Sequence, residues 1–220
     1  MPLTAAIVLL AAQGIPARAV VLDATFKNKP YGKVTYVRGL VPGQGMERTV
    51  TMEVDDESGR YITIEKRTYA AGGAPISVVR THYDALEQIT VTLTYSGLKA
   101  IVTHQTGDDE PETEEFPLDI EAEGAKTNDP SQFWFFGTVP PKNTKVVFWE
   151  YSLDKNSWVE KTVTYTGIAE LKLGEKTVQA HRINISKDTN FYVDDDGMPY
   201  KSSQETGEGT LTLVRREGAD

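Results

Sequence analysis

Residues 88–104, QITVTLTYSGLKAIVTH, decide the fold class of this chain. Apolar and polar side chains alternate along the first half, with Ile89, Val91, Leu93 and Tyr95 on one side and Gln88, Thr90, Thr92 and Thr94 on the other. Alternation with a period of two is typical of a β-strand that buries one face. Ser96-Gly97 then offers a turn and a second run begins at Leu98, so the stretch predicts a β-hairpin.

Short runs of the same kind recur along the chain, separated by clusters of Gly, Asp, Asn and Ser, which favour turns. They lie at residues 33–38, 47–54, 60–68, 76–83, 145–151, 158–165, 168–173, 176–186, 190–194 and 209–216. With the hairpin they predict an all-β protein: a single curved up-and-down antiparallel sheet, or half-barrel, of about twelve strands with one short helix. We expect residues 20–220 to form a single β-domain.

The composition supports this fold and excludes several classes of protein. Thr, Val and Ile make up 56 of the 220 residues, and β-branched residues favour strands. The chain has no cysteine, which excludes disulfides, thiolate zinc sites and cysteine nucleophiles. A net charge of −9 argues against nucleic acid as a partner, because neutralising phosphates requires clustered Lys and Arg.

The first nineteen residues have the features of a secretory signal. Residues 5–12 form an unbroken apolar run that is too short to span a bilayer, and Ala17-Arg18-Ala19 fits the small-x-small pattern of a cleavage site. Residues 1–4 lack the usual basic residue, so an N-terminal strand or a buried helix is the alternative. The sequence predicts a signal peptide over residues 1–19 and a periplasmic or secreted location in a bacterium. No later stretch approaches 18 apolar residues, so we do not expect the chain to span a membrane.

One short helix is predicted at Asn128-Asp129-Pro130-Ser131-Gln132. This stretch offers a capping residue, a proline for the first helical position and a Gln three residues after Asp129, which is the capping-box arrangement. The aromatic run that follows is Phe133, Trp134, Phe135 and Phe136. It either plugs the core or forms one wall of a ligand site on the concave face of the sheet. The other residues expected to line an apolar trough there are Ile89, Val91, Leu93, Val146, Phe148 and Val163.

Acidic residues are concentrated in one segment. Residues 107–123, GDDEPETEEFPLDIEAE, carry nine carboxylates and no basic residue, which leaves 23 acidic and 23 basic residues elsewhere. Two prolines and the lack of a sustained apolar run predict a solvated connection between an N-terminal and a C-terminal set of strands. Weak calcium binding through the carboxylate oxygens and recognition of a basic partner are the alternatives.

The chain from residue 133 onward resembles a known architecture over about 80 residues. Pro140-Pro141-Lys142-Asn143-Thr144 precedes two aromatic strands, and a Gly-centred hairpin and a terminal aromatic strand follow. The matching turn and packing residues are Gly174, Ala180, Arg182, Ile183, Tyr192, Asp196, Gly197 and Pro199. This order is similar to the C-terminal half of uncharacterised bacterial secreted proteins with a curved, half-barrel sheet. Such half-barrels distantly resemble the lipoprotein carriers, whose concave apolar face can hold an acyl chain, although the long helices of the carriers are not evident here.

Arg182 interrupts the alternation of its strand, because it shares a face with Val178 and Ala180. A bulge near His181 would bring the apolar residues onto one face. Without a bulge, Arg182 lies either beside a carboxylate or at a concave rim, where it could contact the acidic head group of a ligand.

Motifs for catalysis are weak. The two Ser-x-x-Lys matches, at residues 96–99 and 152–155, fall on predicted hairpin turns, where the Lys cannot be held against the Ser. His82, His104 and His181 lie on three predicted strands and could form a zinc site only if those strands converge. The sequence therefore predicts no catalytic residue, no metal ligand and no cofactor.

These observations favour a non-catalytic protein with a binding or envelope-structural role. The expected partner is an apolar or acyl-bearing small molecule or lipid, or another envelope protein. The predicted ligand contacts are Phe133, Trp134, Phe135, Phe136, Phe148 and Arg182. A carbohydrate-contacting surface module is the alternative, because Trp134, Trp149 and Trp158 could stack on sugars. A metal-dependent enzyme ranks third.

Cleavage after Ala19 gives the first testable prediction. Protein secreted from a bacterial host should begin at Val20, because signal peptidase cuts after the second small residue of the pattern. N-terminal sequencing of the mature protein measures this, and an Ala19→Arg variant, which should not be cut, is the control. A mature pool that retains Met1 would exclude the signal peptide.

Overall fold

Fourteen antiparallel strands make up the described part of the chain in the computed structural model, which covers residues 17–41, 45–56, 59–84, 86–119 and 126–216. The N-terminal strands are β1 (Arg18–Phe26), β2 (Lys29–Val41), β3 (Gly45–Asp56), β4 (Gly59–Tyr69), β5 (Pro75–Tyr83), β6 (Gln88–Ser96), β7 (Lys99–Thr106) and β8 (Glu112–Pro117). The C-terminal strands are β9 (Lys145–Ser152), β10 (Ser157–Leu173), β11 (Lys176–Ile185), β12 (Thr189–Val193), β13 (Pro199–Thr206) and β14 (Gly209–Arg215). The 3₁₀ helix η2 (Pro130–Phe133) lies between the two sets.

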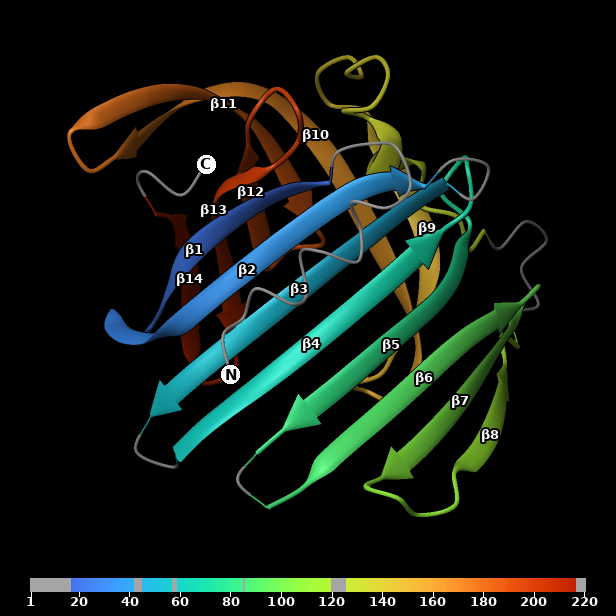
Figure 1. Cartoon of the computed structure of the whole chain (residues 1–220). Helices are drawn as coiled ribbons and strands as arrows, with labels where there is room; N and C mark the ends of the chain where they lie inside the picture. The colour runs from blue at the N-terminus through green and yellow to red at the C-terminus, as the bar shows by residue number, and fades with distance from the viewer. Residues whose placement is uncertain (1–16, 42–44, 57–58, 85, 120–125, 217–220) are drawn as a thin grey trace.

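All of these strands belong to a single open sheet, in the order β8-β7-β6-β5-β4-β3-β2-β1-β14-β13-β12-β11-β10-β9. Each set is an up-and-down meander, and the first strand pairs with the last, from Leu22 opposite Arg215 to Phe26 opposite Leu211. Figure 1 shows the N-terminal meander, blue to green, facing the orange and red strands of the C-terminal meander. The predicted all-β, single-sheet, up-and-down architecture is confirmed, with fourteen strands in the described residues where about twelve were expected.

The predicted hairpin at residues 88–104 is present, with its two-residue turn at Gly97-Leu98, one position after the expected Ser96-Gly97. Ile89 to Ser96 pair with Thr106 to Lys99, and Gly97 takes a positive φ of 60° at the first position of the two-residue turn. That backbone conformation suits Gly and matches the right-handed twist of the flanking strands.

The difference in strand number has local causes. The runs at 158–165 and 168–173 form one strand, β10, because a bulge between Tyr165 and Gly167 shifts the register without ending the ladder. Three strands were missed: β1, which overlaps the predicted cleavage site, and β8 and β13, whose polar sequences ETEEFP and PYKSSQET hide the alternation. The predicted signal peptide lies largely outside the described residues, and Arg18 and Ala19 begin β1.

The acidic segment 107–123 is only partly a connection. Residues 112–117 form the edge strand β8, which pairs with β7 from His104 opposite Glu112 to Lys99 opposite Pro117. The solvent exposure predicted for its carboxylates is observed at Glu112, Glu114 and Glu115. The described residues 118–119 and 126–144 belong to the chain that links the two meanders.

The sheet coils so that its two ends overlap. Phe148 and Glu150 of β9 face the interior cavity, whereas Tyr151 points the other way into a cluster with buried residues of the N-terminal meander. Those residues are Val78, Leu93, Ala100 and Val102 of β5, β6 and β7. Side chains therefore seal the seam between β8 and β9: the Phe116 and Tyr151 rings lie 4.9 Å apart, and Trp158 Nε1 donates to the Phe116 carbonyl at 3.0 Å.

No helix among the described residues has the length and apolar character needed to cross a membrane.

Because the two ends of the sheet overlap at Tyr151, whose side chain is 2% exposed, we expect this residue to contribute to stability. Tyr151→Ala should lower the free energy of unfolding by about 3–5 kcal/mol, because it truncates a buried aromatic residue at the seam. Val147→Ala is the control on the same strand, where the side chain is 41% exposed and the expected loss is within about 1 kcal/mol. Urea unfolding measures both, and equal losses would show that the two ends of the sheet do not depend on this contact.

Candidate functional site

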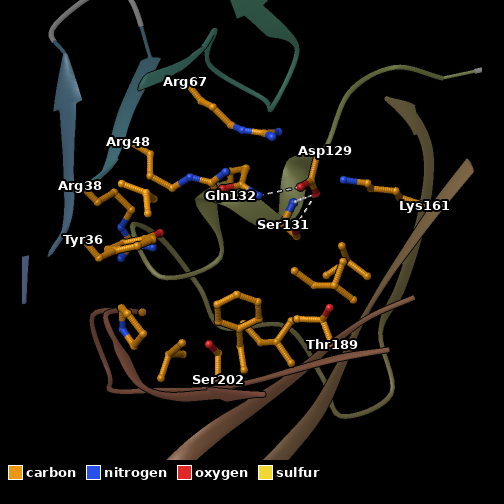
Figure 2. Close-up of a pocket in the computed structure, with 18 of the residues that line it drawn as sticks. Tyr36, Arg38, Arg48, Arg67, Asp129, Ser131, Gln132, Lys161, Thr189 and Ser202 are labelled. Carbon is orange, nitrogen blue, oxygen red and sulfur yellow. Dashed lines mark hydrogen bonds between the residues drawn. The ribbon is translucent and has the colours of Figure 1, made fainter. Parts of the chain in front are cut away.

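A cavity of about 440 Å³ lies between the two meanders. Its apolar lining includes Leu22, Val34, Val50, Phe135, Phe148, Val163, Ile183, Ile185, Phe191, Val193 and Leu213. Its charged lining consists of Arg38, Arg48, Arg67, Lys161, Glu65, Asp129 and Glu150. Figure 2 shows the arginines entering from the N-terminal strands, with Thr189 and Ser202 on the opposite, C-terminal wall.

The helix η2 closes part of this cavity, and it has the predicted N-cap residue and first-turn proline, although Gln132 bonds the Asp129 carboxylate and not its backbone N–H as a capping box requires. Asp129 is the N-cap residue: its carboxylate accepts hydrogen bonds from Ser131 N at 3.1 Å and from Gln132 Nε2 at 2.7 Å. Asp129 is 4% exposed, and burial raises its pKa even though these hydrogen bonds act in the opposite direction. The capping carboxylate therefore lines the cavity and also fixes the helix beside it.

Gly73 positions the cap against the N-terminal meander. Asp129 N donates to the Gly73 carbonyl at 2.8 Å. A Cβ atom on Gly73 would come within 2.2 Å of the Asp129 carbonyl oxygen, and its φ of +90° also favours glycine. The close approach of this turn, which follows β4, thus depends on a residue without a side chain.

The four aromatic residues after the cap divide between core and cavity. Trp134 is buried in a cluster with Phe148, Val163 and Tyr165, and Phe133 contacts Phe136. Phe135 lines the cavity and packs edge-on against His181, with ring centres 5.2 Å apart. Of the predicted ligand contacts, the structure therefore brings Phe135 and Phe148 to the cavity.

Phe136 and Arg38 form the rim next to Phe135. The Arg38 guanidinium lies 4.5 Å from the centre of the Phe136 ring, and Phe136 is 37% exposed. Arg38 and Phe135 line both the main cavity and a smaller pocket of about 90 Å³, which the exposed Arg18 and Asp196 also border. These two side chains separate the cavity from the surface on this side.

The turn at residues 194–197 fastens this rim, because each of its three aspartates meets a basic residue. Asp194 accepts from Arg215 at 2.9 Å, Asp195 lies 3.0 Å from His181 Nε2, and Asp196 is bonded to Arg18. The Asp196 carbonyl also accepts from Arg38. The next residue must be glycine, because a Cβ atom on Gly197 would lie 2.6 Å from the Phe135 ring.

A buried network of ion pairs crosses from β4 and β5 to β9 and β10. The Glu65 carboxylate accepts from Arg67 at 2.6 Å and from Arg80 at 2.7 Å, and Arg67 also pairs with Glu150. Lys161 is the second partner of Glu150. Burial alone would raise the pKa of Glu65, but Arg67 and Arg80 lower it to about 2. The carboxylate is therefore ionised at neutral pH.

Arg182 lies away from the cavity. Ile183 lines the cavity, so its neighbour Arg182 points to the other face of β11, where it donates to Asn190 at 3.0 Å and lies over the Tyr192 ring. The predicted bulge near His181 is instead on the partner strand β10, at the register shift between Tyr165 and Gly167. The extra residue there changes which side chains oppose Arg182.

The three histidines do not converge. His82 on β5 contacts Thr63 at 3.0 Å, His104 is on β7, and His181 on β11 contacts the Tyr165 hydroxyl at 2.7 Å. Within the described ranges, no group of three or more His, Asp or Glu side chains is placed to hold a metal ion.

The sequence reasoning missed the arginines that line the cavity, although it contained a signal for them. Arg38 shares its strand face with Val34 and Tyr36, and Arg48 shares its face with Val50 and Met52. A basic residue on the apolar face of a strand is costly to bury, which makes it a candidate for function.

The comparisons with known proteins bear on the fold. No family model matches the chain, and no curated protein matches it. A crystal structure of a beta-barrel-like protein of domain of unknown function DUF1849 from Brucella abortus superposes with a TM-score of 0.57 at 14% identity. The match covers 93% of this chain and 97% of that one. At this identity the similarity concerns the fold alone.

The ion-pair network predicts a pH dependence. Because the pKa of Glu65 is lowered in the folded state, its stabilisation is present above its ordinary pKa of 4.5 and is lost as the pH falls toward about 2. Glu65→Gln should therefore cost about 3 kcal/mol at neutral pH, and the difference from wild type should shrink at about pH 3. Urea unfolding at both pH values measures this.

The control for this experiment is Glu87→Gln, at an exposed position, with an expected change within about 0.5 kcal/mol. A cost at Glu65 that stays constant from neutral to acid pH would contradict the ionic role of this carboxylate.

Proposed function

We propose that this chain is a non-catalytic binding protein that holds an apolar or acyl-bearing molecule in the cavity between its meanders. The observation that carries the proposal is the cavity itself, about 440 Å³ with one wall of aliphatic and aromatic side chains. Small-molecule sites in proteins typically measure roughly 300–1,000 Å³, with mostly apolar walls and a few placed polar groups. An acyl chain gains about 0.8 kcal/mol for each methylene removed from water.

The apolar wall suits a chain better than a sugar. Ile183 and Ile185 of β11, Phe191 of β12 and Leu213 of β14 contribute to it from neighbouring strands. Side chains two residues apart on a strand share a face, so the wall can follow an extended hydrocarbon.

The tryptophans weigh against the carbohydrate alternative. Trp134 is buried in the core, and Trp149 and Trp158 are half-buried. Trp158 is enclosed at the seam by Tyr95 and Tyr151. A stacking platform for sugars needs exposed aromatic faces, which the buried Trp134 and the enclosed Trp158 do not offer.

The proposal includes a periplasmic or secreted location in a bacterium, which rests on the apolar and small-x-small pattern of residues 1–19. A carrier of acyl chains or an envelope protein with a lipid as partner fits that location, since a hydrocarbon chain needs a protein to shield it from water. The resemblance to lipoprotein carriers stated above is part of the same proposal.

The test fills the cavity. Ile183→Trp should weaken binding of hexadecanoate by about 5- to 150-fold, because overpacking a filled site costs about 1–3 kcal/mol. Ile168→Trp makes the same exchange on β10 at a side chain that is 64% exposed, and should bind as wild type does. Displacement of an environment-sensitive dye gives the affinities, and native mass spectrometry shows any lipid-sized mass that copurifies.

Far-ultraviolet circular dichroism confirms that both variants are folded. The proposal is wrong if wild type binds neither hexadecanoate nor hexadecanol and carries no copurified mass. Equal affinities in the two tryptophan variants would place the binding site elsewhere.

A further inference from the structure

The register of the N-terminal meander places four arginines side by side. Arg18 of β1 is directly opposite Arg38 of β2, Arg38 is opposite Arg48 of β3, and Arg48 is opposite Arg67 of β4. Arg18 belongs to the predicted signal peptide, so cleavage after Ala19 would leave Arg38, Arg48 and Arg67 in this row. Arg38, Arg48 and Arg67 all line the cavity. Like charges directly opposite one another on neighbouring strands are destabilising. Such a row persists only where anions or other acceptors offset it.

Three of the four arginines have such a partner. Arg18 is bonded to the Asp196 carboxylate, and Arg38 donates to the carbonyl of the same residue. Arg67 pairs with Glu65 and Glu150. Each of these contacts uses an acceptor that the fold itself provides.

Arg48 is the exception. Among the described residues no acidic side chain forms an ion pair with it, its Nε is buried without a hydrogen-bond acceptor, and the residue as a whole is half-buried at the cavity wall. Figure 2 shows its side chain extending into the cavity toward Gln132. Burial lowers the pKa of Arg48, but Tyr69, Tyr36 and Glu65 raise it and the net shift is upward, so the guanidinium is cationic. A partly buried cation without an anionic partner is unfavourable, and an anion in the cavity would reduce that cost.

The charged side chains that line the cavity also favour an anionic ligand. Four basic side chains, Arg38, Arg48, Arg67 and Lys161, face three acidic ones, Glu65, Asp129 and Glu150. This excess is local, because the whole chain carries a net charge of −9. The acidic exterior thus encloses a cavity with an uncompensated positive charge.

We propose that Arg48 binds the anionic head group, a carboxylate or a phosphate, of the molecule in the cavity. This inference rests on the proposed function and specifies the chemical class of its ligand. A planar guanidinium offers paired N–H donors that match the oxygens of either group. With the head at Arg48, the hydrocarbon lies along the opposite wall, against Ile183 and Leu213.

The test compares three probes with the same chain: hexadecanoate, hexadecyl phosphate and hexadecanol. After copurified lipid is removed on a hydrophobic resin, wild-type protein should bind at least one anionic probe about tenfold or more tightly than the alcohol. The two anionic arms distinguish a carboxylate site from a phosphate site. Binding is followed by dye displacement for all three probes.

Arg48→Gln should abolish the preference for the anionic probe while hexadecanol binds as it does to wild type. Arg48→Lys should retain part of the preference, because the charge remains but the paired donors are lost. Arg60→Gln is the matched control, since the Arg60 side chain is 66% exposed and its variant should keep the full preference. Thermal unfolding without ligand adds a second readout: removal of the unpaired cation should not lower the melting temperature of Arg48→Gln.

The possible results distinguish the role of Arg48 from the proposal that the cavity binds a ligand. Equal affinity of wild type for the alcohol and both anions, or an unchanged preference in Arg48→Gln, overturns the role of Arg48 but leaves the cavity as a binding site. A large drop in the melting temperature of ligand-free Arg48→Gln assigns the residue to structure and also overturns this inference. Failure of all three probes to bind overturns the proposed function together with it.

Discussion

The pairing of β1 with β14 is the constraint on which the rest of the molecule depends. Five residue pairs join the first and last strands, and Arg216 adds an ion pair to Asp23 across 193 positions of sequence. Loop closure over such a distance is entropically costly and favours slow folding. Leu22 of β1 and Leu213 of β14 both line the cavity, so its two walls meet only once this pairing has formed. The cavity therefore exists only when the two meanders are joined through β1 and β14, and neither meander forms it alone.

Charge also determines how the two meanders meet. The row of arginines belongs to the N-terminal strands, whereas Asp196 and Glu150, which offset it, belong to the C-terminal half. Buried ion pairs add little net stability because desolvation is costly, and they are better at specifying one arrangement over others. The fold leaves Arg48 outside this pairing, with its Nε unpartnered at the cavity wall.

The alternation of apolar and polar residues predicted the fold class, but it did not predict which residues line the cavity. Residues 88–104 show a clean period of two, so their hairpin was predictable and its turn to within one residue, and Asp129 before Pro130 indicated the N-cap. The strand β8 was hidden because glutamates occupy both of its faces, and Arg182 was assigned to the cavity because the bulge that sets its surroundings lies on the partner strand. Arg38, Arg48 and Arg67 are far apart in sequence, and only the strand register brings them together.

The edge strand β8 has a consequence for how copies of the molecule behave in solution. Among the described strands one side of its backbone has no ladder partner, and edges of that kind can template aggregation. Glu112, Glu114 and Glu115 project from it into solvent, so an approaching second copy brings carboxylates against carboxylates. Salt screens this repulsion over about 10 Å at 0.1 M ionic strength. Colloidal stability of the protein is consequently tied to ionic strength, and the concentration of acidic residues in one segment protects the open edge of the sheet.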